Sequence, residues 1–197
     1  MAVMSIGKPD PPAGRLTVQD LARTPDDGRR YELADGKLDV SPAPVFLHTL
    51  IEGRLCTHLG SVAPSEFAVL PGAGINLTAD RTRHRVPDPA VIRLSDADHP
   101  YLTRPPALAV EVVSPESVFR DNHTKRREYA EFGIESYWIV APEKEGIMEF
   151  RLDDDQYVET AQVYGDDVFE TDFPFPLKIV PTWLTADGPW KRHIGGE

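Results

Sequence analysis

Apolar and polar residues alternate on both sides of Asp35-Gly36, and this alternation predicts a β-hairpin over residues 31–40. A period of two is typical of a strand with one buried face. Asp-Gly favours a two-residue turn, because both of its positions tolerate a positive φ. The predicted apolar face comprises Tyr31, Leu33, Leu38 and Val40, and the polar face comprises Glu32 and Asp39.

Helical periodicity follows in two longer segments. Over residues 45–59, leucine and isoleucine recur every three or four positions, as on the buried stripe of an amphipathic helix. Residues 121–132 form the second predicted helix, with Asp121 as its N-cap and Gly133 as its stop signal. A short helix is predicted after Leu16, where Thr17 and Asp20 have the spacing of a capping box.

Short apolar runs between turn residues predict the strands. Residues 108–113 and 137–140 are almost continuously apolar, as central strands buried on both faces should be. Further strands are predicted over residues 67–70, 75–77, 86–94, 147–152 and 156–163, with a polar loop over 79–84 and an aromatic segment, 173–183, packed on the sheet. Hairpins mixed with crossover helices predict an α/β fold with a mixed central β-sheet flanked by helices.

Length and composition indicate one domain. The chain has 197 residues, of which 41% are hydrophobic and 27% charged. Residues 1–14 and 187–197 are expected to be tails around a single domain, 15–186, with the first tail disordered. No apolar run is long enough for a membrane helix and no signal peptide is recognisable, so a cytoplasmic location is expected. Cys56 lies in the apolar helical pattern and is interpreted as a packing residue.

The net charge of −11 argues against a protein that coats nucleic acid, whose affinity comes from neutralising phosphates. The charge is unevenly distributed, since residues 81–127 contain nine Lys or Arg against six Asp or Glu. Two interpretations stay open: an acidic surface that aids solubility, or a basic channel on an otherwise acidic body. The candidate contacts to a nucleic-acid backbone are Arg81, Arg83, Arg85, Arg126 and Arg127.

Glu111 interrupts the apolar run 108–113 and is the first candidate for chemistry. A buried carboxylate is costly unless it is paired or binds a metal, so Glu111 is either a metal ligand, the partner of an arginine, or at a wet end of the sheet. Asp88 begins the preceding long strand, which can lie beside that of Glu111. Two such carboxylates can hold Mg²⁺, which activates water and neutralises charge on a phosphate.

Lys125 shares one side of its predicted helix with Asp121 and Tyr129, each one turn away. It could face the carboxylates and assist an attacking water, or it could be an exposed member of a Lys-Arg-Arg run. Glu32 is either a third acid of the site or a solvent-facing residue.

His48 and Glu52, one turn apart, could face the same cleft, although a lone histidine is more often structural. The six histidines form no HxH or HxxxH pair, so a zinc site is not expected.

These residues occur in an order that resembles the Uma2 (DUF820) family from about Leu16 to Thr185. The ordered set is Asp27–Gly36, Ser41-Pro42, His48, Leu70-Pro71-Gly72, Val86–Val91, Tyr101–Pro106, Val110–Pro115, Asp121, Lys125, Tyr129, Gly133 and Glu135–Val140. That family is similar in fold to the PD-(D/E)XK restriction endonucleases. The resemblance therefore implies a restriction-endonuclease-like mixed sheet, with an additional N-terminal hairpin and C-terminal strands.

The same resemblance implies that Asp88 and Glu111 are metal ligands, that Lys125 does the work of the motif lysine, and that Glu32 is a further acid. The usual motif places its lysine two residues after the second acid, where this chain has Val113. Glu116 and Ala141 depart from the family pattern as well.

The function implied is that of an endonuclease that uses Mg²⁺ or Mn²⁺ to hydrolyse DNA, expected to act as a homodimer. Two alternatives stay open. The first is a nucleic-acid-binding or assembly module with little or no turnover on the same fold. The second is the hydrolysis of a smaller phosphoester.

Overall fold

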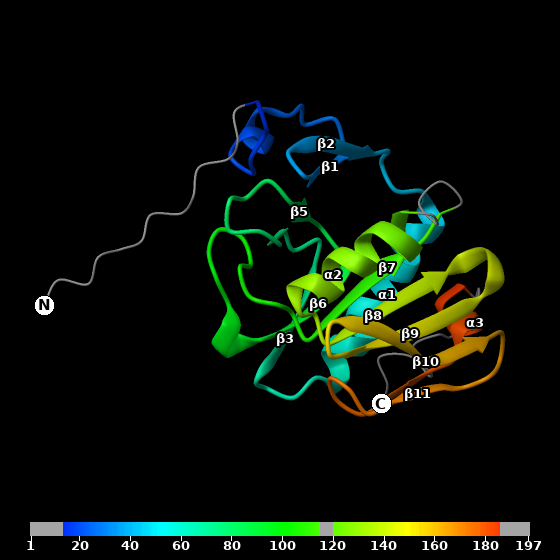
Figure 1. Cartoon of the computed structure of the whole chain (residues 1–197). Coiled ribbons are helices and arrows are strands. Elements are labelled where there is room, and N and C mark those ends of the chain that lie inside the picture. Colours follow the sequence, from blue (N-terminus) through cyan, green and yellow to red (C-terminus); the bar gives the residue numbers. More distant parts are fainter. Residues whose placement is uncertain (1–13, 115–119, 186–197) are drawn as a thin grey trace, which may run out of the picture.

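The computed structural model describes residues 14–114 and 120–185, without the side chains of 120–122, and a six-stranded mixed sheet forms its centre (Figure 1). The strand order is β10-β9-β8-β7-β6-β3, and every neighbouring pair is antiparallel except β7 with β8. The strands are β3 (Phe67–Pro71), β6 (Pro89–Arg93), β7 (Leu108–Val112), β8 (Ser136–Ala141), β9 (Gly146–Asp153) and β10 (Gln156–Tyr164). The predicted mixed sheet with flanking helices is confirmed.

The parallel pair β7 and β8 is joined through a helical crossover, because parallel neighbours cannot be connected by a tight turn. A π-helical segment, η3 (Arg120–Lys125), continues directly into α2 (Arg126–Phe132). Gly133, with φ of 92°, ends α2 in the left-handed conformation that favours glycine, as predicted. The predicted N-cap role of Asp121 concerns a side chain outside the described part.

Two hydrophobic cores lie on opposite faces of the large sheet. Leu108, Val110 and Val112 of β7 pack in the core under α1 (Phe46–Val62). The intervening Ala109 belongs to the other core, under α2. Strand alternation therefore directs the side chain of Glu111 to the α2 face of the sheet.

The segment after β10 closes the α1 face. Strands β11 (Phe169–Thr171) and β12 (Leu177–Ile179) pair with each other, and the short α3 (Pro181–Thr185) follows them. Phe175, Leu177 and Leu184 are buried in the same core as α1, so the predicted packing of residues 173–183 is confirmed. The remaining helices are the 3-10 turns η1 (Asp20–Arg23), η2 (Leu94–Asp96) and η4 (Pro142–Lys144).

A second, smaller sheet has the order β2-β1-β5-β4 and lies above the large sheet in Figure 1. Its strands are β1 (Arg30–Ala34), β2 (Lys37–Ser41), β4 (Ile75–Asn76) and β5 (His84–Arg85). The predicted hairpin is confirmed, and both turn residues, Asp35 and Gly36, have positive φ. Strand β5 begins at His84, the last residue of the predicted polar loop 79–84, and ends at Arg85.

Strand β2 presents its faces in the opposite sense to the prediction, and on β1 both Glu32 and Leu33 are buried, the latter as predicted. Glu32, expected on the polar face, is 1% exposed, whereas Leu38 and Val40 are 46% and 41% exposed. The cause is Arg85 on β5, whose fully buried guanidinium contacts Glu32 and Asp39. Glu32 and Asp39 turn inward to neutralise this arginine, whereas the aliphatic side chains of β2, Leu38 and Val40, turn outward.

In the described residues, no helix combines the length and the apolar character needed to cross a membrane.

Candidate functional site

The candidate site is a pocket of about 230 Å³ where the end of β2, the start of α1 and strand β7 meet. Its charged lining consists of Arg30, His48, Asp88, Glu111 and Lys125. These residues come from five separate stretches of the sequence, so the fold alone brings them together. Residues 40 to 45 form a mostly apolar wall beside them.

Asp88 is held against β7 by backbone hydrogen bonds. Its amide donates to Val110 O at 3.0 Å, and the Val112 amide donates to its Oδ2 at 2.7 Å. These two bonds flank Glu111, and they fix the Asp88 carboxylate next to the strand that carries it. The two predicted metal ligands thus line one pocket from adjacent stretches of the sheet.

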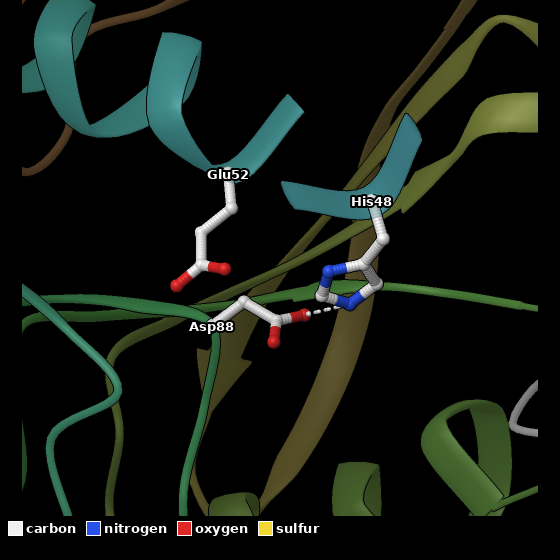
Figure 2. Close-up of side chains that lie close together, drawn as sticks. All are labelled: His48, Glu52 and Asp88. Carbon is white, nitrogen blue, oxygen red and sulfur yellow. Dashed lines mark ion pairs between the residues drawn. The ribbon is translucent and has the colours of Figure 1, made fainter. Parts of the chain in front are cut away.

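Two side chains contact the oxygens of the Asp88 carboxylate. Arg30 Nη1 donates to Oδ1 at 2.6 Å, and His48 Nε2 lies 3.2 Å from Oδ2 (Figure 2). Burial alone would raise the pKa of Asp88, but the His48 hydrogen bond, the Arg30 charge and the Val112 amide outweigh burial and lower the pKa to about 2. Asp88 is therefore a carboxylate at neutral pH.

Glu111 lies on the other side of the pocket and is bound by two donors from the helical crossover. Lys125 Nζ and the Tyr129 hydroxyl each donate to Glu111 Oε1 at 2.8 Å. Burial, together with the charges of Glu111 and Glu32, raises the pKa of Tyr129 well above its ordinary value. Tyr129 therefore keeps its proton and stays a donor to Glu111.

Lys125 is 1% exposed and lies between two carboxylates. Its Nζ is 2.8 Å from Glu111 Oε1 and 3.3 Å from Glu32 Oε1. The lysine is the last residue of the π-helical segment, a local irregularity that is frequent at functional sites. The geometry excludes an exposed Lys125 and a solvent-facing Glu32, two of the alternatives that the sequence left open.

Behind Lys125, a buried ion-pair network centres on Arg85. Its Nε and Nη2 bind both oxygens of Glu128 on α2, at 2.6 and 3.1 Å. Its Nη1 binds Asp39 at 2.7 Å and lies 3.3 Å from Glu32 Oε2. The network connects β1, β2, β5 and α2, and it fixes the helix that carries Lys125 relative to the small sheet.

A family model named Uma2, with the description "Putative restriction endonuclease", matches residues 18–181. The chain belongs to the Uma2 family. A search of curated proteins finds no match.

A solved structure from Anabaena variabilis ATCC 29413, described as "a putative nuclease belonging to DUF820", has the same fold as the Uma2 chain. The two superpose with a TM-score of 0.65 at 16% sequence identity, over 86% of this chain and 97% of the other. The likeness shows that the chain shares the mixed α/β fold of that protein, in agreement with the fold class predicted from the sequence. Both descriptions name nucleases.

The five arginines expected to contact a nucleic-acid backbone do not line the pocket of the Uma2 chain. Arg85 is fully buried and bound by carboxylates, so the structure corrects its expected role as a backbone contact. Arg83 pairs with Asp35 and Glu131, and Arg126 lies 4.1 Å above the ring centroid of Phe150. Arg81 has a buried Nε, whereas the side chain of Arg127 is 68% exposed.

The pocket cation that the sequence reasoning missed is Arg30, whose side chain is 25% exposed. Burial would lower the pKa of Arg30, but the charges of Asp88, Glu111 and Glu32 raise it further above its ordinary value. The available signal was the position of Arg30 inside the Asp27–Gly36 stretch that carries part of the family resemblance.

His48 and Glu52, one turn apart on α1, lie beside Asp88 (Figure 2). One potential ligand atom from each of the three residues lies within 4.8 Å of the others. His48 Nδ1 is buried without a hydrogen-bond partner among the described residues. Burial and the Asp88 charge raise the pKa of Glu52.

With Nε2 protonated toward Asp88, Nδ1 of His48 presents a lone pair. The donor set of carboxylate oxygens and one imidazole nitrogen therefore fits a divalent cation of the Mg²⁺ or Mn²⁺ type. Asp88 is shared between this group and the predicted pair with Glu111. Which carboxylates bind the ion stays a prediction.

The lowered pKa of Asp88 predicts a specific loss of stability in acid. The pKa of Asp88 is lowered from 3.8, its ordinary value, to about 2 in the fold. The ionised carboxylate therefore stabilises the protein fully above pH 3.8, and this stabilisation is lost as the pH falls to about 2. We expect the free energy of unfolding to fall by on the order of 2 kcal/mol over this window.

Denaturant unfolding at a series of pH values tests this, with Asp88→Asn as the variant and the exposed Asp153→Asn as its control. Asp88→Asn should flatten the acid slope and Asp153→Asn should leave it unchanged. An equally steep slope in Asp88→Asn would contradict the lowered pKa.

Proposed function

We propose that this protein is an endonuclease that hydrolyses phosphodiester bonds of DNA with the help of Mg²⁺ or Mn²⁺. The observation that carries the proposal is the convergence of Asp88, Glu111 and Lys125 on one pocket. Two carboxylates beside a lysine are the groups needed to hold a hard cation and to neutralise a phosphate. Membership of the Uma2 family supports the same reaction.

In this proposal Asp88 and Glu111 hold the cation, and His48 and Glu52 lie close enough to Asp88 to complete its surroundings. The bound ion supplies Lewis acidity and a water of lowered pKa. The hydrogen bonds to Asp88 from the Val112 amide and Arg30 fix the direction of its carboxylate. Because the carboxylate is already oriented, little conformational entropy is lost when the cation binds.

Lys125 and Arg30 provide the positive charge for the substrate. Lys125 is held at a fixed position by Glu111 and Glu32, so its ammonium group can stabilise negative charge on the phosphate without reorganisation. Arg30 adds a planar guanidinium at the same pocket, which suits a phosphate with two oxygens to bind. Tyr129 positions Glu111 and does not need to move a proton.

Calorimetric titration with Mg²⁺ and Mn²⁺ tests the metal site. Wild type should bind, and Glu111→Ala should bind at least about 10- to 100-fold more weakly, the range found when only an outer partner of a metal site is lost. Glu143→Ala removes an exposed acid from η4 and should bind like wild type. Equal binding by Glu111→Ala and wild type would contradict the assignment of Glu111.

Cleavage assays on DNA test the reaction itself. The proposal requires metal-dependent cleavage that is lost in both Asp88→Ala and Glu111→Ala, and activity that survives both changes would overturn it.

The alternative, a nucleic-acid-binding or assembly module, is favoured by one observation: Glu111 and Lys125 neutralise each other at 2.8 Å. Salt-dependent DNA binding without product over long incubation would support that alternative. Homodimer formation, which would supply one site for each strand, is proposed with the nuclease and is measured by sedimentation velocity.

A further inference from the structure

One wall of the pocket is apolar and solvent-exposed, in contrast to its charged floor. Val40 on β2 and Val45 before α1 both line the pocket, and they are 41% and 68% exposed. Pro42 and Pro44 lie between them in the same wall. The wall is therefore part of the site that contains Asp88 and Lys125, and it cannot be assigned to a separate surface.

Phe46 follows this wall in the chain. It is the first residue of α1, directly after Val45, and it is 82% exposed. The residues of α1 that face the sheet, such as Ile51 and Leu55, are fully buried, so Phe46 takes no part in the core. Burial of an aromatic ring is strongly favourable, and a ligand that covers the exposed ring of Phe46 would gain this free energy.

We propose that Phe46, with Val45 and Val40, stacks against an unpaired base next to the phosphate that binds at the charged floor. This inference rests on the proposed function and defines its substrate class as single-stranded DNA, or DNA with an unpaired nucleotide beside the cut. A nucleotide has an anionic part and a flat aromatic part, and the pocket offers Arg30 and Lys125 for the first and the apolar wall for the second.

The need for an unpaired base follows from the geometry of stacking. In a duplex both faces of each base are covered by its neighbours, so an aromatic side chain reaches a base face only when the base is unstacked. The pocket, with a volume of about 230 Å³, can accommodate a phosphate group beside the apolar wall. A second copy of this chain is the competing occupant of the wall, and it contains no phosphate for the charged floor beside it.

Fluorescence anisotropy with a labelled single-stranded oligothymidylate, with Ca²⁺ in place of Mg²⁺, tests the stacking without requiring turnover. Phe46→Ala should weaken binding about 5- to 150-fold, the equivalent of about 1–3 kcal/mol for one stacked base. Phe46→Tyr should bind like wild type, because it keeps the ring. Val158→Ala, which truncates a 50% exposed residue on the edge strand β10, is the control and should leave binding unchanged.

Two further measurements separate the possible outcomes. Wild type should bind the oligothymidylate more tightly than the same sequence in a duplex, and Phe46→Ala should lose that preference. Equal binding by Phe46→Ala and wild type overturns the stacking, whether or not cleavage is found. A dimer in sedimentation velocity that dissociates in Phe46→Ala also overturns it, because the wall is then covered by a second copy. Loss of cleavage in Asp88→Ala reports on the proposed function alone.

Discussion

Arg85→Met is expected to lower the free energy of unfolding by about 3–5 kcal/mol, the cost of breaking a buried ion pair by removing one partner. The guanidinium of Arg85 is fully buried and contacts Glu128, Asp39 and Glu32. Methionine fills a similar volume but leaves these carboxylates without their shared cation. Burying carboxylates that have lost a main counter-charge is costlier than losing an exposed charge.

Urea denaturation followed by circular dichroism measures this loss. Arg127→Met is the matched control, since Arg127 is a 68% exposed arginine whose pair with Glu131 should contribute little. Arg85→Met/Glu128→Leu should recover part of the stability, because one orphaned carboxylate is removed with the cation. An Arg85→Met protein that is as stable as wild type but binds DNA more weakly would restore the role that the sequence suggested for Arg85.

Lys125→Met is expected to reduce kcat for DNA cleavage by about 10²- to 10³-fold, the usual cost of removing one preorganised group that stabilises charge in the transition state. The KM should change less, because the ammonium group is required for the developing charge more than for binding the ground state. Lys125→Arg keeps the positive charge and should retain part of the activity.

The control is Lys178→Met, which removes a 65% exposed cation from β12 without touching the pocket. Circular dichroism must show that Lys125→Met is folded, since Glu111 and Glu32 lose their common partner. A folded Lys125→Met enzyme with wild-type kcat would reduce Lys125 to a structural ion pair.

Much of the fold was predictable because its strongest signals are local. The hairpin turn at Asp35-Gly36 and the continuous apolar strands β7 and β8 follow from turn chemistry and hydrophobic pattern. The inward orientation of Glu32 and Asp39 was not predictable, because their partner Arg85 is distant in sequence and belongs to a strand of two residues. A pattern can show that two faces differ, but it cannot show which face meets a buried arginine.

The site residues also divide into those with a local sequence signal and those placed by contacts distant in sequence. Glu111 was recognisable because a carboxylate in an apolar strand violates the local pattern. His48 gave no comparable signal, since one histidine on a helix is usual. Its position beside Asp88 depends on the packing of α1 against the large sheet. Arg30 likewise has no local signal that distinguishes it from the other arginines of the chain.

The way in which Lys125 and Arg30 neutralise the carboxylates of the pocket has a consequence for how the protein is made. The fold supplies its own counter-charges to Glu111 and Asp88, at 2.8 and 2.6 Å, so the acidic site does not repel itself during folding. We therefore expect the protein to fold without a divalent ion. Within the proposed function, the ion concentration sets how much of the accumulated protein can cut, and not how much of it accumulates.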